Sequence, residues 1–466
     1  MRPQLEEAAN APHRVFYAAK RALQSHASGG NVLIAATVLA LIVANLPGIN
    51  VLYNDFWNQE IRLQIGSFNI FSHAGHPMSM LQFINDALMA IFFFTIGLEI
   101  KREVLVGELS SFRQALLPIV AAVGGMAVPV IFYLLLSNGT DYADGAAIPM
   151  ATDIAFSLGI LAMLGRRVPL SLKIFLTTLA VVDDIGGIIV IAACYSSHID
   201  VPYILYGLAL LGTLFLGTGL HIQSKIFYLA IGTVVWYLFL NSGIHPTIAG
   251  VLIAFCIPAT PVFAPKKYVK MIRKAISQFN AEDDEQLSRR TILSKDQMDW
   301  LKQVESASDK VISPLQDLED SLHPIVNYLI IPLFAFANAG ITFYGMDPSA
   351  LWSGVSLAII CGLVLGKFLG IFIFSWATVK LGLAPMPEYC NWKMIASIAM
   401  LGGIGFTVSL FIANLTFDSS TAEGLALLNN AKLGIVAGSL LSGVLGFVLL
   451  HHFLPKTSCD EDSEEC

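Results

Sequence analysis

The chain has 466 residues, of which 55% are hydrophobic and 13% are charged, and its formal net charge is −7. Soluble globular proteins carry about 25% charged residues, so this composition excludes that class and is typical of helices packed in lipid. The six cysteines lack the spacing of a metal or redox site, which argues against a cysteine-based function.

The N-terminal segment, 1–30, lacks the apolar core and cleavage site of a secretory signal. Within it, residues 12–24 predict a short basic amphipathic helix on the inner membrane surface. Twelve apolar stretches follow, each near the ~20 residues that a helix needs to cross a bilayer. They are 31–46, 81–100, 112–136, 144–163, 171–194, 201–219, 224–240, 244–258, 323–346, 351–380, 392–417 and 430–455.

This pattern predicts an all-α, multi-pass membrane protein, with transmembrane helices 1–8 in 31–258 and helices 9–12 in 323–455. Basic residues support the count. With the N-terminus inside, the outer loops hold only Arg62, whereas ten basic residues lie across 266–310 on the inner side. Such asymmetry predicts that both termini are cytoplasmic.

Three segments are expected to lie outside the membrane. Residues 51–72 alternate polar and apolar side chains and predict a β-hairpin in an outer loop. An exposed hairpin could pair with a second copy, or it could lie on its own chain. The long inner loop, 259–322, predicts a solvated connector, and the acidic tail, 456–466, predicts a disordered segment.

Two spans are interrupted in the middle. Residues 149–153 interrupt 144–163, and residues 402–409 interrupt 392–417. Each interrupted span is the second in a group of three, and the two groups begin on opposite sides of the membrane, so any repeat is inverted. Interrupted helices in corresponding positions of two halves point to the binding site of a transporter.

Asp183 and Asp184 lie together near the middle of the span 171–194. One carboxylate at the bilayer centre costs about 2.5–3.5 kcal/mol on the insertion scale. A structural pair would need two buried cationic partners, and we expect Lys367 to be the single buried lysine. We therefore interpret the aspartates as a site for a proton or a small cation.

Burial disfavours the charged form of a carboxylate, so a buried aspartate can exchange a proton, and its ionised form can bind a cation. Na⁺ and Li⁺ are hard ions that prefer oxygen ligands. Thr152, Asp153, Asp183 and Asp184 supply oxygens without histidine or cysteine, which disfavours a zinc or copper site. Asp153 and Lys367 are also placed to balance the partial charges of facing half-helix ends.

Lys367 lies beside a small-residue face, in the pattern Gly362-x-x-x-Gly366-x-x-x-Gly370, which favours close helix packing. A structural salt bridge with an aspartate is the alternative to a transport role for this lysine. Asp86 is positioned to line an ion path, with structural hydrogen bonding as the alternative. The residues at inner helix ends could form a generic charged boundary: Glu99, Arg102, Glu319 and His323.

Several motifs together resemble the NhaA family of bacterial Na⁺/H⁺ antiporters. They are residues 85–94, 97–103, 151–159, 182–186, 332–340, 366–367 and 403–407, and the likeness covers about 31–455 apart from the long inner loop. The resemblance implies twelve helices in the inner membrane, with two interrupted helices crossing at the centre. It implies that Asp184 and Asp183 bind the ion, with Thr152 and Asp153 on an interrupted helix and Lys367 as the family's buried lysine.

The resemblance further implies electrogenic export of Na⁺ or Li⁺ in exchange for periplasmic protons. It implies no cofactor, no nucleic acid, and a homodimer formed through the outer hairpin. Glu99, Arg102 and Glu319 match residues implicated in pH regulation, and Asp86 and His323 join them as candidates for pH regulation or ion access. Many members have a histidine after the residue matching Glu319, where this chain has Asp320, so the pH range stays open.

Two other classes fit less well. A passive channel would need a continuous polar lining and residue rings from several copies. A membrane redox or hydrolytic enzyme would need haem-ligating histidines, a metal cluster or a nucleophile–base pair, and the spans contain no such set.

Overall fold

The computed structural model describes residues 29–62, 64–65, 68–69, 71–73, 76–195, 199–261, 265–278, 295, 298–299, 301–302, 311–342, 348–352, 354–418 and 421–455. The helix expected at 12–24, residues 279–294 of the long inner loop and the acidic tail lie outside the described residues.

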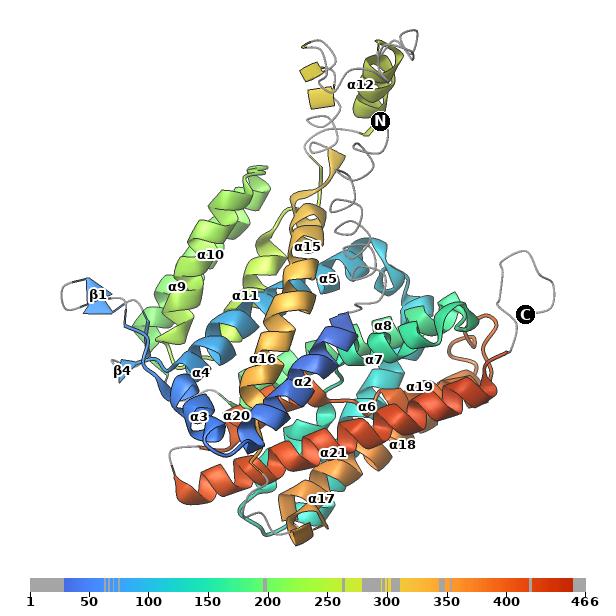
Figure 1. The fold of residues 1–466 in the computed structure, drawn as a ribbon. Helices are drawn as coiled ribbons and strands as arrows, with labels where there is room; N and C mark the ends of the chain where they lie inside the picture. The colour runs from blue at the N-terminus through green and yellow to red at the C-terminus, as the bar shows by residue number, and fades with distance from the viewer. Residues whose placement is uncertain are drawn as a thin grey trace, which may run out of the picture.

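Helices form nearly all of the described chain and pack as one bundle (Figure 1). In chain order they are α2 (Gly29–Asn45), α3 (Ile49–Asn58), α4 (Met80–Phe83), η1 (Ile84–Leu88), α5 (Met89–Val106), η2 (Glu108–Ser110), α6 (Phe112–Ser137), η3 (Ala143–Met150), α7 (Ile154–Met163), η4 (Gly165–Arg167), α8 (Leu170–Cys194), α9 (Val201–Gly219), α10 (Lys225–Leu240), α11 (Pro246–Cys256), α12 (Pro265–Gln278), α15 (Pro314–Ile325), η6 (Val326–Ile330), α16 (Ile331–Asn338), η7 (Pro348–Trp352), α17 (Gly354–Cys361), η8 (Gly362–Gly366), α18 (Lys367–Lys380), α19 (Trp392–Leu401), α20 (Phe406–Thr416) and α21 (Ala422–Phe453).

Within the described residues, eight helices are long and apolar enough to cross a membrane, and two bent helix pairs raise that number to ten. The shorter apolar helices α10 and α11 come in addition. This is the architecture of a polytopic membrane protein. Large apolar side chains such as Leu135, Phe215 and Ile226 are exposed on its flanks, as expected of a surface that contacts lipid rather than water.

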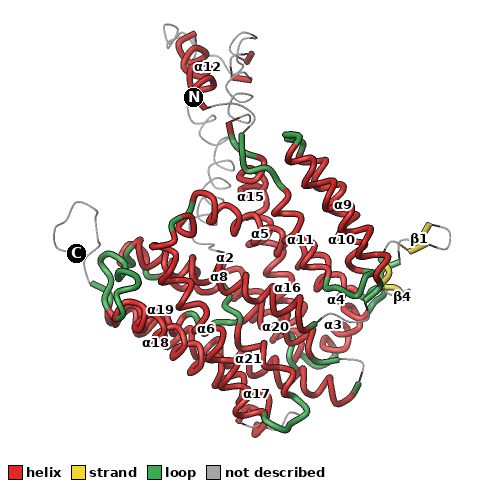
Figure 2. The backbone as a smooth tube through the Cα atoms, turned by 180° about the vertical axis from the view of Figure 1, so that it is seen from behind, coloured by secondary structure: helices red, strands yellow, loops and turns green. Residues whose placement is uncertain are grey.

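The two ends of the bundle differ in charge. The end that we call the basic end carries the α5–α6, α7–α8, α9–α10 and α18–α19 connections, with Lys101, Arg113, Arg167, Lys225 and Lys380. The opposite end, the strand end, carries the short strands and the ends of α6, α8 and α20 (Figure 2).

The β-hairpin expected over 51–72 is wrong in its first part, because Ile49–Asn58 forms α3. Tyr53 and Trp57 are four residues apart, a helical spacing, and both are buried. The Tyr53 hydroxyl donates to the Phe336 carbonyl oxygen at 2.5 Å, which fixes α3 on α16. Two pairs of two-residue antiparallel strands follow: β1 (Gln64–Ile65) with β2 (Phe68–Asn69), and β3 (Ser72–His73) with β4 (His76–Pro77).

Both expected interruptions are present. The 3₁₀-helix η3 ends at Met150, the chain is then extended to Asp153, and α7 begins at Ile154. Helices α19 and α20 are bent by 42° at residues 402–405, where three of the four residues are glycine. The backbone N–H of Asp153 donates to the Ile404 carbonyl oxygen at 2.6 Å, so the two breaks are in contact.

Two helix boundaries differ from those expected. Helix α15 begins at Pro314 rather than at 323, because Ser313 caps it by accepting a bond from the Gln316 N–H at 3.3 Å. Helix α21 begins at Ala422 rather than at 430, with Thr421 as its cap. The earlier start of α15 places Glu319 inside a helix instead of in the connector.

Candidate functional site

Asp183 lies on α8 against a buried lysine. Its side chain forms an ion pair with the ammonium group of Lys367, which begins α18 and is 0% exposed. The Thr152 hydroxyl accepts a bond from Lys367 Nζ at 2.7 Å. The same hydroxyl lies 2.6 Å from Asp183 Oδ2 and 3.0 Å from the Gly402 carbonyl oxygen. Because a hydroxyl has one proton, Thr152 donates to one of these acceptors at a time.

Asp153 joins the two interrupted helices. Its Oδ1 accepts from the Phe156 N–H at 3.0 Å and caps α7. Its Oδ2 accepts from the Thr407 N–H at 3.0 Å and from the Thr407 hydroxyl at 2.5 Å, at the start of α20. Helix N-termini carry partial positive charge, so one carboxylate offsets two half-helix ends, where the sequence predicted it to lie.

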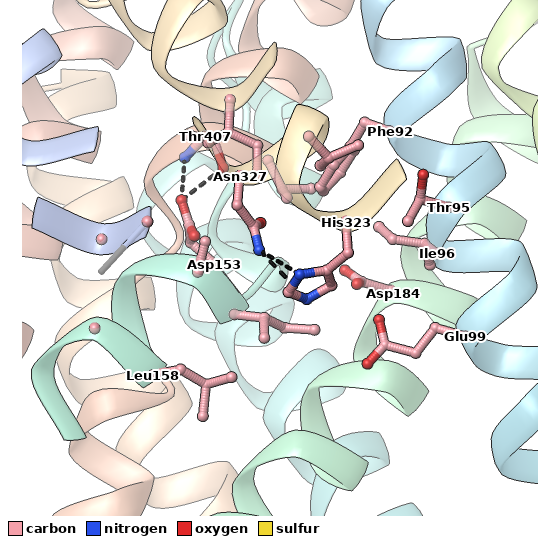
Figure 3. A pocket seen from close by; sticks show the side chains of 18 of the residues that line it. Phe92, Thr95, Ile96, Glu99, Asp153, Leu158, Asp184, His323, Asn327 and Thr407 are labelled. Carbon is pink, nitrogen blue, oxygen red and sulfur yellow. Dashed lines mark hydrogen bonds between the residues drawn. The ribbon is translucent and has the colours of Figure 1, made fainter. Parts of the chain in front are cut away.

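Asp184 faces a cavity of about 380 Å³ (Figure 3). Thr152, Asp153 and Thr407 line the same cavity, and no hydrogen bond or ion pair reaches Asp184 from the part of the chain that the structure describes. Asp183 and Lys367 do not line this cavity. The neighbouring aspartates therefore have different surroundings: Asp183 is paired, and Asp184 is open to the cavity.

The four predicted cation ligands are thus not gathered at one point. Thr152, Asp153 and Asp184 share the cavity, and Asp183 is turned toward Lys367. Among the described residues, no group of three or more His, Cys, Asp or Glu side chains is placed to hold a metal ion. Hydroxyl and carboxylate oxygens around the cavity nevertheless match the ligands that hard cations take.

The cavity extends toward the basic end between α5 and α15. Glu99 and His323 line it there, and the His323 ring is hydrogen-bonded to the Asn327 amide at 3.1 Å (Figure 3). Arg102 forms ion pairs with Glu319 at 2.7 Å and with Glu103 at 2.9 Å. The structure therefore brings the predicted inner-end residues together around a single contact between α5 and α15.

Asp86 lies elsewhere, in the π-helix η1. Its Oδ1 is 3.7 Å from His245 Nε2 at the start of α11, and it does not line the cavity that holds Asp184. Beside it, Asn85 accepts from the Asn338 amide at 2.9 Å, and Asn338 accepts from the Asn414 amide at 2.9 Å. Asp86 thus belongs to a polar cluster that links η1, α11, α16 and α20.

Sequence reasoning missed two features of the site. Lys432 on α21 is 8% exposed, so the expectation that Lys367 is the single buried lysine is wrong; its position inside the last span was the available signal. Asn327 and Tyr328 line the cavity from the π-helix η6. Such turns occur often at functional sites, but no local pattern marks this one.

The comparisons with known proteins agree on one family. The family model described as Na⁺/H⁺ antiporter 1 matches residues 20–450. A Na⁺/H⁺ antiporter NhaA of Phocaeicola vulgatus is 53% identical over 443 residues, which cover 95% of this chain and 97% of the relative. NhaA of Bacteroides fragilis is 54% identical over 426 residues, 91% of this chain and 95% of the relative. NhaA of Oleidesulfovibrio alaskensis is 43% identical over 444 residues, 95% and 94% of the two chains. With a match over most of its length and relatives at this identity, the chain belongs to the Na⁺/H⁺ antiporter 1 family.

Proposed function

We propose that this protein is a secondary active transporter that exports Na⁺ in exchange for protons across the bacterial inner membrane. The observation that carries the proposal is the unequal pair of buried carboxylates: Asp184 faces a cavity, and Asp183 is held by Lys367. The relatives, which are named Na⁺/H⁺ antiporters, support this assignment.

The proposed topology has twelve crossings, an inverted repeat and cytoplasmic termini. Counting each bent pair as one span gives ten, and α10 and α11 bring the number to twelve. The interrupted spans η3–α7 and α19–α20 would then occupy corresponding places in the two repeats. Since basic loops favour the cytoplasm, the basic end would face inward and the cavity at Asp184 would be open to the cytoplasm.

In the proposed cycle, cytoplasmic Na⁺ enters the cavity and displaces a proton from Asp184. Oxygens of Thr152, Asp153 and Thr407 lie beside it and can replace part of the ion's hydration shell. After a rearrangement that exposes the site to the periplasm, protons displace the ion. If Asp183 also takes up a proton, its bond with Lys367 is broken, and two protons are exchanged for each Na⁺. The cycle is then electrogenic.

Replacement of Asp184 by asparagine tests this function. In everted vesicles, Asp184→Asn should abolish the Na⁺-driven change in fluorescence of a pH dye, because an amide cannot exchange the proton. Asp55→Asn on α3 is the matched control, since Asp55 lies outside the cavity, and it should retain exchange. Full Na⁺-dependent dequenching by Asp184→Asn would overturn the site.

We also propose that Li⁺ is a second substrate and that the contact between α5 and α15 regulates exchange with pH. Arg102 of α5 and Glu319 of α15 are paired, and Glu99 and His323 of the same two helices line the cavity, so a change in charge at this contact would alter cation access. Proton flux driven by Na⁺, Li⁺ and K⁺ in proteoliposomes, compared between the wild type and Glu319→Gln, tests both points. A pH profile unchanged by Glu319→Gln would overturn the regulatory role.

A further inference from the structure

A second cavity, of about 540 Å³, lies at the strand end of the bundle. Its lining includes Asp144 and Met150 of η3, Val190 and Cys194 of α8, Tyr195, and Thr416 at the end of α20. Met150 lines this cavity and Thr152 lines the one that holds Asp184. Along this segment of the chain, Ala151 alone separates the two linings.

Hydrogen bonds cross the second cavity at its rim. The Thr416 hydroxyl is 3.0 Å from the Tyr195 hydroxyl, which lies 3.3 Å from the Asp144 carbonyl oxygen. Burial raises the pKa of the Tyr195 hydroxyl, so this group stays protonated at neutral pH and can remain a donor. The cavity is therefore lined by a hydroxyl pair and one carboxylate near the surface and by apolar side chains farther in.

One face of α8 connects this cavity with Asp183. At 3.6 residues per turn, Gly187, Val190 and Cys194 all lie within about 40° of Asp183 around the helix axis, and they stand about 6, 10 and 16 Å along it. Gly187 is buried, yet a Cβ atom placed there would meet no atom within 4 Å. An empty space thus lies one turn from Asp183, in the direction of the cavity.

Only one of the two carboxylate oxygens of Asp183 has hydrogen-bond partners among the described residues. Thr152 and Lys367 both contact Oδ2 of Asp183. Oδ1 is buried and has no hydrogen-bond partner among the described residues. Buried polar atoms are usually satisfied by protein or by ordered water, and a space beside the atom can admit water. The unpartnered oxygen and the space at Gly187 are separate observations on one face of α8, about one helical turn apart.

We propose that the second cavity and the space beside Gly187 form a proton path from the periplasm to the Asp183–Lys367 pair, separate from the cavity through which Na⁺ reaches Asp184. The inference rests on the proposed function. The inner part of this proton path is lined by Gly187 and Val190, which offer no side-chain oxygen to replace the hydration shell of Na⁺. A file of water molecules there can still pass protons.

A proton that arrives by this path binds Asp183 and converts its carboxylate to a neutral acid. The ammonium group of Lys367 then loses its counter-charge, so the ion pair is broken without any movement of Na⁺ along the path. The other charged group that acts on the pair is Asp184 on α8, and Asp153 at the break and Glu99 on α5 act in turn on Asp184. Asp144 is the charged group on the periplasmic cavity.

Filling the space at Gly187 tests the path. In proteoliposomes, Gly187→Val should lower the exchange rate at saturating Na⁺ by roughly tenfold, since proton delivery contributes strongly to rates, and should leave the apparent Na⁺ affinity unchanged. The deficit should shrink as the periplasmic-side pH is lowered, because more protons compensate for a narrower path. Gly212→Val is the matched control, since Gly212 is exposed on α9 and its added side chain would also meet no atom within 4 Å.

A rate equal to that of Gly212→Val, or a deficit that does not respond to periplasmic pH, would overturn the path. If the wild-type protein shows no Na⁺–proton exchange, the proposed function fails instead, so the two failures are distinguishable.

A native cysteine gives a second measurement. Cys194 is exposed and lines the cavity. A membrane-impermeant cationic methanethiosulfonate reagent added from the periplasmic side should therefore modify Cys194 and slow exchange. The rate of Cys194→Ser should be the same with and without the reagent. Failure to modify Cys194, or modification that leaves the rate unchanged, would contradict the inference.

Discussion

The side chains of Asp183 and Asp184 leave α8 about 100° apart, because successive residues in an α-helix are separated by that angle. One carboxylate therefore reaches Lys367 on α18, and the other reaches the cavity beside α5 and α15. A run of two aspartates in a sequence predicts a buried charge. It cannot tell which of the two is paired, since that depends on how distant helices pack around α8.

The two aspartates should differ in their effect on stability. Asp183→Asn leaves the buried ammonium group of Lys367 without a counter-charge and should lower the free energy of unfolding by about 3–5 kcal/mol. Asp184→Asn breaks no hydrogen bond or ion pair within the described chain and should change it by less than about 1 kcal/mol. Thermal unfolding of the two purified variants in detergent measures the difference.

A second substitution separates the ion pair from other causes. Adding Lys367→Met to Asp183→Asn removes the unpaired charge, so the double variant should recover much of the lost stability. Equal melting temperatures for Asp183→Asn and Asp184→Asn, or no recovery in the double variant, would contradict the assignment of the pair.

At the scale of elements, the crossing of the two interrupted helices depends on Asp153. One carboxylate caps α7 and also accepts two bonds at the start of α20. Asp153→Ala should lower the free energy of unfolding by about 1–3 kcal/mol, since a helix cap and bonds to a charged group are lost together. Asp200→Ala is the control, because Asp200 begins α9 without a side-chain cap bond. Similar melting temperatures for the two variants would contradict this role.

The glycines of η8, between α17 and α18, set how closely Lys367 approaches the site. A Cβ atom at Gly362 would lie 2.7 Å from Pro149 Cβ, and one at Gly366 would lie 2.7 Å from Pro129 Cα. Both distances are shorter than ordinary contacts, so the small-residue face predicted from the sequence is confirmed. These glycines allow η8 and α18 to pack directly on α6 and η3.

A larger side chain on this face should push the helices apart. Gly366→Leu should lower the free energy of unfolding by about 1–3 kcal/mol through overpacking, and it should reduce exchange because Lys367 follows directly in the chain. Gly212→Leu, on the exposed face of α9, is the control. Unfolding in detergent and flux in proteoliposomes check the two effects. Wild-type values for Gly366→Leu would show that the close contact is dispensable.

At the scale of the whole molecule, hydropathy predicts the presence of many membrane-spanning helices well, because each span depends on local composition alone. The interruptions could be predicted too, since proline and clustered glycines mark them locally. Helix α3 was mistaken for a strand because Tyr53 and Trp57 fit two periodicities, and their contact with α16 decides between them. The cavity walls could not be predicted, because they are assembled from helices far apart in the sequence.

We further propose that the strands β1–β4 join two copies of the chain at the strand end. Deleting residues 64–77 should convert a dimer to a monomer with its exchange per protomer preserved, because the described residues of this segment lie outside the cavities that hold Asp184 and Cys194. Light scattering of the detergent-solubilised protein measures the molecular mass of the oligomer. A dimer that persists after the deletion would place the interface elsewhere.

Lys432 helps to set the net charge of the buried side chains. Apart from Glu319, which is paired with Arg102, the buried carboxylates and lysines of the described chain are Asp153, Asp183, Asp184, Lys367 and Lys432. Fully ionised, they sum to one surplus negative charge. An empty carrier would therefore move that charge through the field, at about 2.3 kcal/mol per 100 mV, which discourages slippage. Loaded with Na⁺ the interior is neutral, and loaded with two protons it is positive by one. In the proposed cycle, the membrane potential would therefore act on the step in which the proton-loaded carrier returns. The step in which the carrier moves Na⁺ would not depend on voltage.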